Sequence, residues 1–429
     1  MKRLPVFVFF LYCRLVFSQA GEGLTLEECY SEAEKLWPLA ANRDMLAEVT
    51  ELKIKNVNTG FFPKADLSAQ ATYQSDVTEI DIEIPAMSPA MQAFSIDIPS
   101  PSKDQYKASV DISQMIYDGG LGKYMKKLEE ASLQTDLQQI ETELFKLREQ
   151  INRFFFTALL FQENARVLSM KHDELSDRIK ILESGVRNGI LTESDADILK
   201  AELLKLEQQQ MEIRHNRAGV LKMLGIMIQR ELVDSIVLVL PESGTTLPSE
   251  LSRPESELFD LQAQKIEAGS TLIARKRYPL LYGFGQFGYG RPGLNMMSDE
   301  FAPYYIVGAK LTWNIWDWKY NRREREVLTV QSDMITTQKE SFEKSVQILL
   351  AGEAASIERL TALLEKDSEI IRLRSNITAA SSSKLENGVI TPADYVTDLN
   401  NETTARISYE MHKIQLAQAR INYITLLGK

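Results

Sequence analysis

The most constraining feature of this sequence is an internal duplication. The segment Tyr117–Gly120 resembles Trp316–Lys319, and the motif Asn-Gly-aliphatic-aliphatic-Thr-x-x-Asp at 188–195 recurs at 387–394. Both repeats are offset by 199 residues. In each copy, 71 residues separate the aspartate of the first motif from the glycine of the second. Such a long, equal spacing predicts a rigid element of fixed length that occurs twice.

The segment between the two motifs is predicted to form one long helix in each copy. The sequence has no proline between Pro101 and Pro241 or between Pro303 and Pro392. In the first copy, apolar residues recur at alternating steps of four and three, which predicts a left-handed coiled coil. A single helix of this length would extend about 105 Å. The apolar series is Leu133, Leu137, Ile140, Leu144, Leu147, Ile151, Phe154, Ala158, Phe161, Ala165 and Leu168, continuing through His172 to Leu175, Ile179, Leu182 and Val186.

Each long helix is predicted to turn back at a tight tip. Gly189 and Gly388 fit the left-handed position that ends a helix. Thr192 and Thr391 fit the N-caps of the returning helices. An aspartate follows each threonine at the third helical position, where the positive end of the helix favours an acid. Each copy therefore contains a helical hairpin.

A pair of strands is predicted before each long helix. Apolar and polar residues alternate along these segments, with aromatic residues near the ends, which is typical of transmembrane barrel strands. In the third strand the aromatic residues change face between Phe284 and Phe287, which indicates a bulge. Residues 76–104 are proline-rich and are predicted to form a long irregular loop. The strands are predicted at about 64–74, 106–117, 280–290 and 304–316.

Four strands are too few to close a membrane barrel, because the smallest such barrels have about eight strands. In lipid, the open edges of a four-stranded sheet would leave backbone groups without hydrogen bonds. The chain is therefore predicted to oligomerise, and three copies would supply twelve strands.

The beginning of the sequence has the pattern of a secretory signal peptide. The apolar run Leu4–Phe17 follows Lys2 and Arg3, and its 14 residues are too few to span a membrane. We predict a signal peptide at 1–18. Without its three basic residues, 46 basic and 60 acidic residues remain, and the net charge of −14 disfavours nucleic acid as a partner. Cys29 is then the single cysteine, which excludes an internal disulfide and a cysteine-based metal cluster.

The chain resembles the TolC-like outer-membrane efflux protein family over roughly residues 24–428. The resemblance implies a mainly α fold with a β-barrel portion, in which a strand pair plus a long coiled-coil hairpin is duplicated. It also implies a homotrimer, whose 12-stranded outer-membrane barrel continues into a 12-helix periplasmic tunnel. The residues that carry the resemblance are Leu24–Glu28, Phe62-Pro63, Tyr117–Gly120, Tyr278-Pro279 and the two tip motifs.

The resemblance further implies a function in the outer membrane of a Gram-negative bacterium. The chain would be the exit duct of a tripartite efflux or type I secretion system. It would passively conduct substrates to the exterior from a periplasmic adaptor (membrane fusion) protein and an inner-membrane pump. The implied partners are two further copies of the chain, the adaptor, the pump and outer-membrane lipid, and the resemblance implies no enzymatic activity, metal or cofactor. The cargo remains open between a drug, a metal cation, a siderophore and a protein.

The resemblance also implies roles for residues at the tips. The adaptor would dock at Gly189, Thr192, Gly388 and Thr391, and Asp195 and Asp394 would form an entrance gate. In a trimer, three Asp394 carboxylates around a narrow opening would raise each other's pKa and attract cations. The alternative is that both aspartates simply cap their helices, and the two roles are compatible. Ile390 stands where some family members have an arginine, so an arginine latch is not predicted.

The predicted domain organisation follows the duplication. The signal peptide at 1–18 is followed by a first repeat at 19–230 with its tip near 189–192, an inter-repeat linker at 231–254, and a second repeat at 255–429 with its tip near 388–391.

Two other classes of protein fit parts of the sequence. A soluble periplasmic coiled-coil scaffold or adaptor would explain the heptads, but not four lipid-patterned strands at matched positions. A secreted enzyme would need a nucleophile–base pair, a metal motif or a phosphate loop, and none is found. The Gly283–Gly288 segment matches GxGxxG, but a strand follows it where a dinucleotide site needs a helix. A cluster of tryptophans at the end of the last strand is predicted to lie at a membrane interface: Trp313, Trp316 and Trp318.

Overall fold

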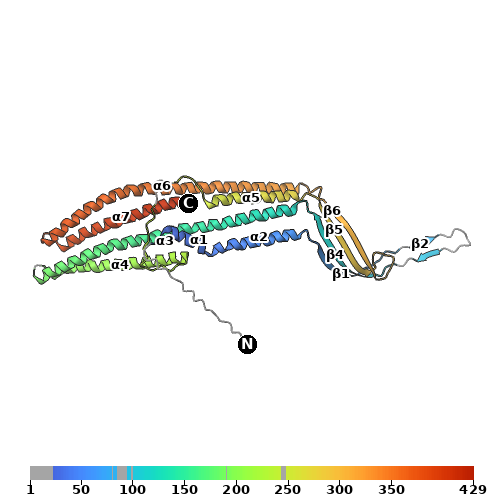
Figure 1. Cartoon of the computed structure of the whole chain (residues 1–429), viewed down its shortest axis with the longest axis horizontal. Helices are drawn as coiled ribbons and strands as arrows, with labels where there is room; N and C mark the ends of the chain where they lie inside the picture. Colours follow the sequence, from blue (N-terminus) through green and yellow to red (C-terminus); the bar gives the residue numbers. More distant parts are fainter. Residues whose placement is uncertain (1–22, 80, 85–93, 98–99, 190, 243–247) are drawn as a thin grey trace, which may run out of the picture. The chain divides into compact units, whose positions relative to one another are not determined.

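The structure is a computed structural model that describes residues 23–79, 81–84, 94–97, 100–189, 191–242 and 248–429 (Figure 1). The predicted signal peptide lies outside these residues, as does Ile190 of the first tip. The helices are α1 (Leu26–Leu36), α2 (Asn42–Thr59), α3 (Leu121–Arg187), α4 (Glu193–Ile228), α5 (Pro254–Arg275), α6 (Tyr320–Glu386) and α7 (Pro392–Leu426), with a short 3-10 helix at Pro38–Ala41. The strands are β1 (Lys64–Tyr73), β2 (Asp81–Ile84), β3 (Phe94–Asp97), β4 (Asp104–Tyr117), β5 (Leu280–Arg291) and β6 (Ala302–Thr312).

The chain packs as two compact units, and each unit combines parts of both sequence copies. Unit 1 consists of Met1–Ala40, Glu143–Arg253 and Ser345–Lys429. Unit 2 consists of Ala41–Thr142 and Pro254–Lys344. The long helices α3 and α6, of 67 residues each, contribute to both units. Unit 2 holds the strands, and unit 1 holds the two hairpin tips.

The sheet of unit 2 has the order β1-β4-β5-β6, and all neighbouring strands are antiparallel (Figure 1). Its register lines up the alternating residues of all four strands, because directly paired residues point to the same face. One face carries apolar rows, of which one is Leu67, Val110, Phe287 and Tyr305. The other face carries a hydrogen-bonded polar group made of Ser68, Ser109, Asp111 and Gln286.

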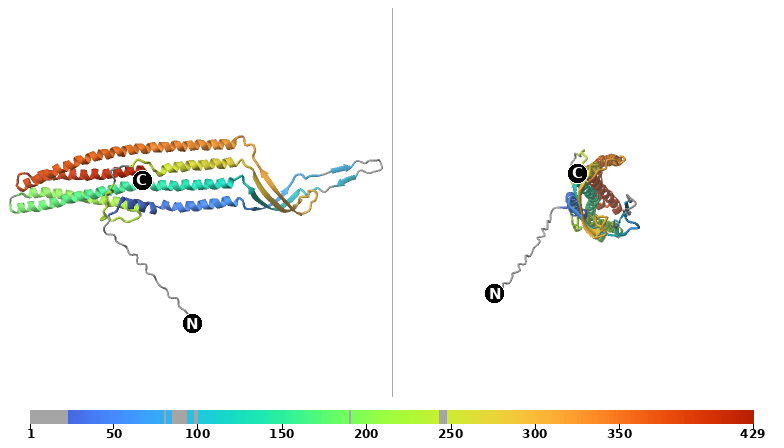
Figure 2. Two further views of the ribbon diagram at one scale, coloured as in Figure 1. Left: turned by 45° about the horizontal axis from the view of Figure 1, so that its top comes forward. Right: turned by 90° about the vertical axis from the view of Figure 1, so that its right-hand side faces the viewer.

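The helical segments of unit 2 follow the same order as the strands they adjoin. Figure 2 shows α2, α3, α5 and α6 side by side in that order. Side-chain contacts join neighbouring helices: Arg43 of α2 pairs with Glu141 of α3, and Lys339 of α6 pairs with Asp260 of α5. Each strand therefore continues into, or follows from, the helix at the same place in the row.

The bulge predicted between Phe284 and Phe287 is wrong. Both neighbours of β5 pair with it in unbroken register there, and the irregularity lies between Met115 and Tyr117 of β4. The aromatic residues of this region lie on both faces because glycines on the facing strand make room for them. A Cβ at Gly308 would come within 2.8 Å of the Phe284 ring.

Two predicted boundaries also differ from the structure. The last strand ends at Thr312 instead of 316, because Thr312 pairs with Leu280, the first residue of β5, and Pro279 before it has no N–H to continue the ladder. The region 76–104, predicted to be irregular, contains the short antiparallel pair β2 and β3.

The heptad series predicted along α3 is buried along most of the helix, from Ile140 through Ala158 and Leu168 to Leu182, and is displaced by one residue at two positions. Phe155 is buried where Phe154 was predicted to be, and Lys171 is buried where His172 was predicted to be. The shift occurs where more than one neighbour covers the helix. Asn152 of α3 accepts a hydrogen bond from Tyr30 of α1 and donates one to Thr425 of α7. Helix α3 therefore packs against several neighbours and not against one partner helix alone.

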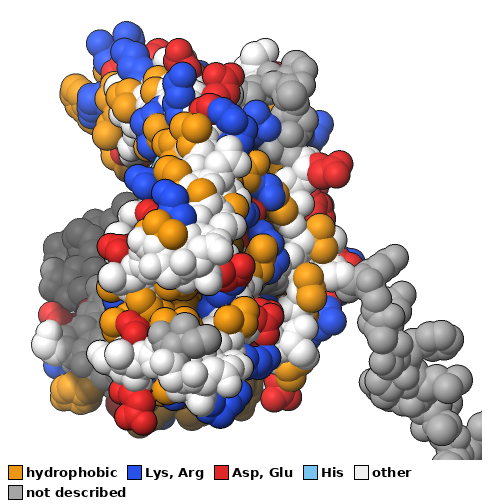
Figure 3. Space-filling view, turned by 90° about the vertical axis from the view of Figure 1, so that its left-hand side faces the viewer, with side chains coloured by type: hydrophobic (Ala, Val, Ile, Leu, Met, Phe, Trp, Pro, Cys, Tyr) orange, Lys and Arg blue, Asp and Glu red, His pale blue; other side chains and the backbone are white. Residues whose placement is uncertain are grey.

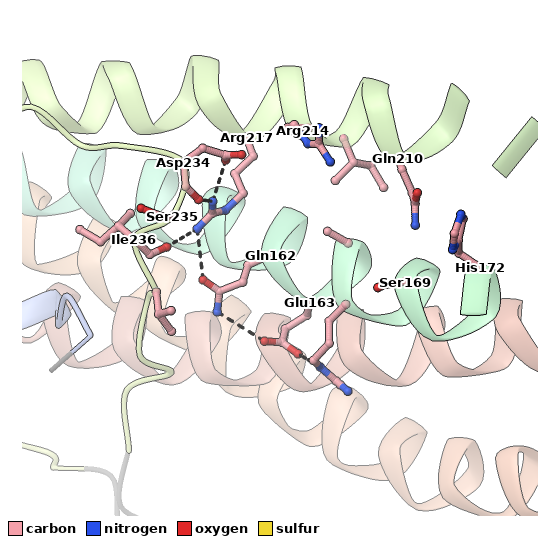
Figure 4. Close-up of a pocket in the computed structure, with 14 residues that line it drawn as sticks. Gln162, Glu163, Ser169, His172, Gln210, Arg214, Arg217, Asp234, Ser235 and Ile236 are labelled. Atoms are coloured by element: carbon pink, nitrogen blue, oxygen red, sulfur yellow. Dashed lines mark hydrogen bonds and ion pairs between the residues drawn. The ribbon is translucent and has the colours of Figure 1, made fainter. Parts of the chain in front are cut away.

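The inter-repeat segment packs on the first hairpin within unit 1. Leu238 forms a bridge with Leu24, and its N–H and carbonyl both bond the side chain of Gln162. Arg217 of α4 is buried, pairs with Asp234 at 2.8 Å and donates to the carbonyl of Ile236 (Figure 4). These bonds fix the segment beside a cleft of about 710 Å³ between α3 and α4.

Candidate functional site at the hairpin tips

Both tips are built from the same local geometry. Gly189 and Gly388 have left-handed φ values of 68° and 71°, and a Cβ on either would meet nothing within 4 Å. The glycines are therefore needed for their backbone conformation and not for space. Each N–H donates back to the last turn of the long helix, to the carbonyl of Val186 or Leu385, at 3.0 Å.

The returning helices begin with matching capping boxes. In the first tip, Thr192 Oγ1 accepts from the N–H of Asp195, and Asp195 Oδ2 accepts from the N–H of Thr192 at 3.1 Å. Thr391 and Asp394 repeat the arrangement, also with a 3.1 Å bond to Asp394 Oδ2. The structure thus confirms that both aspartates cap their helices.

The capping bonds also set the charge at the second tip. The hydrogen bonds from the Thr391 side chain and backbone hold the pKa of the Asp394 carboxyl below its usual range. Asp394 is exposed and therefore carries a full negative charge near neutral pH. Figure 3 views the tip end, where acidic and basic side chains lie interspersed with hydrophobic ones. The bonds of Asp195 and Asp394 stay within their own tips.

The two hairpins pack together just behind the tips (Figure 2). A buried apolar cluster contains residues from all four helices: Leu168, Leu175, Ile179 and Leu182 of α3, Leu199 and Leu206 of α4, Leu385 of α6, and Tyr395 and Leu399 of α7. This cluster joins the first hairpin to the second within one chain.

Sequence reasoning missed a group of polar links that cross the same contact. Lys171 of α3 is only 6% exposed, lies 2.7 Å from Glu202 of α4, and also donates to Asn400 of α7. Burial raises the pKa of Glu202, but the bond and charge of Lys171 outweigh it and leave the pKa below its ordinary value. A buried ion pair therefore lies where α3, α4 and α7 meet.

A second link lies one to two turns closer to the tips. The Tyr395 hydroxyl donates to Glu174 at 2.7 Å, and burial is the main cause that raises the pKa of Tyr395. Arg178 lies over the Tyr395 ring at 5.8 Å and bonds both Glu386 and Ser382 of α6. Lys171, Glu174 and Arg178 recur at steps of three and four on one face of α3. That spacing is the signal in the sequence, although charged residues at such positions are usually exposed.

The described part of the chain offers little chemistry beyond these contacts. Among the residues that the structure describes, no cluster of three or more His, Cys, Asp or Glu side chains is arranged to hold a metal ion. Cys29 is buried, and burial is the main cause that raises the pKa of its thiol to about 12. None of the helices in the described ranges is both long and apolar enough to cross a membrane.

The fold is similar to those of solved outer-membrane proteins. The chain aligns over 94% of its length with the outer-membrane channel CmeC of Campylobacter jejuni, with a TM-score of 0.64 and 14% identity, and it covers 85% of that chain. It also aligns over 94% of its length with the Vibrio cholerae outer-membrane protein VceC, with a TM-score of 0.63 and 12% identity, and covers 96% of that chain. The alignment with the open state of the Neisseria gonorrhoeae outer-membrane channel MtrE likewise covers 94% of this chain and 88% of that chain, with a TM-score of 0.64 and 13% identity. No family model and no curated protein matches the sequence.

These likenesses define the class of fold. The chain has the mainly helical fold of these outer-membrane channels, with four antiparallel strands in two pairs and two long helical hairpins. The fold implied by the resemblance to the TolC-like family is therefore confirmed. At identities of 12 to 14%, the likeness establishes the fold and no more.

Proposed function

We propose that this chain is an outer-membrane exit duct, which passively conducts substrates from a periplasmic adaptor and an inner-membrane pump to the exterior. Three copies would form it, with a barrel of twelve strands and a periplasmic tunnel of twelve helices. It would catalyse no reaction and need no cofactor. The outer-membrane proteins CmeC, VceC and MtrE, which share the fold, support this proposal.

The observation that carries the proposal is the sheet of unit 2. Its apolar face is uncovered by the described part of the chain: Leu67 is 81% exposed and Tyr305 is 70% exposed. In water, an apolar face of this kind would favour aggregation, whereas in lipid it is stable. The opposite face, with Asp111 and Gln286, suits a water-filled interior.

The edges of the same sheet support a closed assembly. Among the described residues, β1 and β6 each pair on one side only. Unpaired N–H and C=O groups cannot face lipid, so each open edge must meet another strand. Pairing of β6 with β1 of the next copy would close a ring without leaving any edge. Neither the uncovered apolar face nor the unpaired strand edges would be expected in a soluble scaffold.

The tips are the proposed entrance and docking site. Gly189, Thr192, Gly388 and Thr391 lie at exposed turns, where an adaptor could reach their backbone. Asp195 and Asp394 would bring negative charge to the entrance, and Asp394 is ionised in its capping box. The links through Lys171 and Tyr395 would hold the two hairpins of a chain together until docking separates them.

Extraction and conductance test the proposal together. The protein should remain with outer membranes after osmotic shock and should need detergent for release, because its apolar sheet faces lipid. Reconstituted in planar bilayers, it should form cation-selective channels. Release by osmotic shock, with no channels in the bilayer, would contradict the proposal and favour a periplasmic scaffold.

The gate can be tested with one conservative change. An asparagine side-chain oxygen can still accept the hydrogen bond from the Thr391 N–H, so Asp394→Asn removes the charge and keeps the capping box. We expect weaker cation selectivity and weaker block by multivalent cations at an unchanged melting temperature. Asp195→Asn is the matched variant at the other tip. Unchanged selectivity in both would limit the aspartates to capping.

A further inference from the structure

The four places where strands join helices share an unusual composition. These junction segments are 56–64, 117–127, 275–279 and 313–325, and all belong to unit 2. They carry 11 basic and 3 acidic residues, whereas the whole chain has 49 basic and 60 acidic residues. Positive charge is therefore concentrated at one level of an otherwise acidic molecule.

Most of this positive charge is not neutralised by the chain itself. Two of the three acids, Asp118 and Asp317, accept backbone N–H bonds from the first turns of α3 and α6, at Gly122 and Asn321. The helix ends at these junctions are thus already capped. Among the described residues, only one of the eleven basic side chains of these segments, Arg322, forms a salt bridge, and Lys126 and Arg277 are among the ten that form none.

Exposed aromatic side chains lie among the basic residues. Trp316 and Trp318 are 69% and 77% exposed and pack edge to face against each other, with ring centroids 5.7 Å apart. Trp313 donates its N–H to the carbonyl of Arg277 at 3.0 Å, which keeps the ring beside that residue. Tryptophan is favoured where one end of a side chain meets lipid and the other meets water.

Two grooves combine these side chains, one in each sequence copy. One, of about 440 Å³, is lined by Phe61, Lys123, Lys126 and Lys127 together with the start of α3. The other, of about 470 Å³, is lined by Arg277, Tyr278 and Trp313 together with the chain beyond β6. The first groove offers three lysines beside the carboxylates of Asp118 and Glu130, and the second offers the guanidinium of Arg277; aromatic side chains in both can contact the carbons attached to a phosphate.

We propose that the junction segments bind the head groups of anionic phospholipids, with Lys126 and Arg277 as the principal phosphate ligands in the two grooves. The inference rests on the proposed function, because it requires the adjoining sheet to lie in a membrane. The strands begin or end at these segments, so the grooves lie at the edge of the apolar face. The surface therefore fits the polar boundary of a lipid leaflet.

Native mass spectrometry of the detergent-extracted protein tests this assignment, with phosphatidylglycerol or phosphatidylcholine as the added lipid. We expect phosphatidylglycerol to bind the unmodified protein at least about tenfold more tightly, since each nearby cation contributes about fivefold. The double variant Lys126→Gln/Arg277→Gln removes one cation from each groove, so the affinity of each groove for phosphatidylglycerol should fall about fivefold, with no change for phosphatidylcholine.

The control variant is Lys222→Gln/Lys344→Gln, which changes the charge equally at two exposed helical lysines outside the junction segments. Its affinity should stay within about twofold of the unmodified protein, because the lost charges lie outside the grooves. Equal binding of both lipids to the unmodified protein, or equal losses in both variants, would overturn the inference. Displacement of the lipid by inorganic phosphate at millimolar concentration would also overturn it, as it would identify a site for the free anion.

The failure of this inference can be told from the failure of the proposed function. An assembly that needs detergent but does not distinguish the two lipids would leave the duct intact and remove the lipid site. A protein that is released without detergent would remove both.

Discussion

The two copies of the sequence use one helix face in opposite ways. On α3, Lys171, Glu174 and Arg178 are polar, yet they lie in the contact with the second hairpin. The residues 199 positions later on α6 are Ile370, Leu373 and Ile377. These are apolar, yet each is more than 40% exposed in the single chain. The polar face is covered and the apolar face is bare.

From this inversion we infer where a second copy of the proposed assembly would pack. By the duplication, the α6 face should receive a hairpin as the α3 face does, but the described residues form no further helical hairpin. Exposed apolar residues on α4, Leu204 and Met211, offer the complementary surface. A second copy would therefore join through apolar contacts, whereas the hairpins within one chain join through polar links beside an apolar cluster. Polar links suit a contact that must open, and apolar ones suit a contact that must persist.

The largest expected effect comes from a charge on the apolar α6 face. Leu373→Glu would bury an unpaired carboxylate between copies, at a cost of about 3 kcal/mol or more in each contact. We expect the trimer to dissociate, which size-exclusion chromatography with light scattering in detergent would detect. Leu373→Met keeps the volume and should leave the trimer intact. A stable trimer of the Glu variant would show that this face is not an interface.

The buried ion pair on the other face should give the next largest effect. Lys171→Met leaves Glu202 buried without its cation and should lower the free energy of unfolding by about 3–5 kcal/mol. The double variant Lys171→Met/Glu202→Met should recover most of this loss. Urea denaturation of the unmodified chain and of both variants compares the two losses. Equal losses in the single and double variants would mean that the pair is not coupled.

The same pair predicts a loss of stability in acid. The pKa of Glu202 is lower in the folded chain than its ordinary value of 4.5, so the folded state binds fewer protons there. The pair therefore stabilises the fold fully above that value, and its contribution is lost as the pH falls through the folded pKa. Melting temperatures between pH 7 and about pH 3 should show a steeper fall for the unmodified chain than for Lys171→Met/Glu202→Met. Parallel curves would contradict this assignment.

The junctions before the long helices give a smaller contrast between the copies. Both use two consecutive left-handed residues, but the first copy has Gly119 and Gly120 where the second has Trp318 and Lys319. Gly120→Ala should cost about 1–2 kcal/mol, because alanine is strained at a φ of 85° and nothing lies close to its methyl group. Thermal unfolding would measure it. An unchanged free energy of unfolding would show that the hydrogen bonds of Asp118 offset the backbone strain at this position.

The smallest effect is expected at Tyr395, where the copies differ most next to the tip. The equivalent residue of the first copy is Ala196. Tyr395→Phe keeps the ring under Arg178 but removes the bond to Glu174, which is worth about 1 kcal/mol. The hairpins should separate more easily, so single-channel recordings should show longer open times. Unchanged open times at unchanged stability would confine Tyr395 to packing.

The tips and the sheet could be predicted because their signals are local. A glycine, an N-cap threonine and an aspartate three residues later define each turn whatever lies around it. The strict alternation of apolar and polar residues likewise predicts which side chains share a face of the sheet. Lys171 could not be found in this way, because its burial depends on Glu202 and Asn400, which are distant in the sequence. The end of β6 at Thr312 depends on where β5 begins, and the room for Phe284 depends on Gly308 of another strand.

Electron microscopy of the detergent-extracted protein tests the central claim most directly. The account predicts a threefold particle with a detergent belt around the strands and six helical hairpins outside it. A monomer, or a particle of any symmetry without a belt at the sheet, would contradict the claim that three apolar sheets close into one membrane barrel.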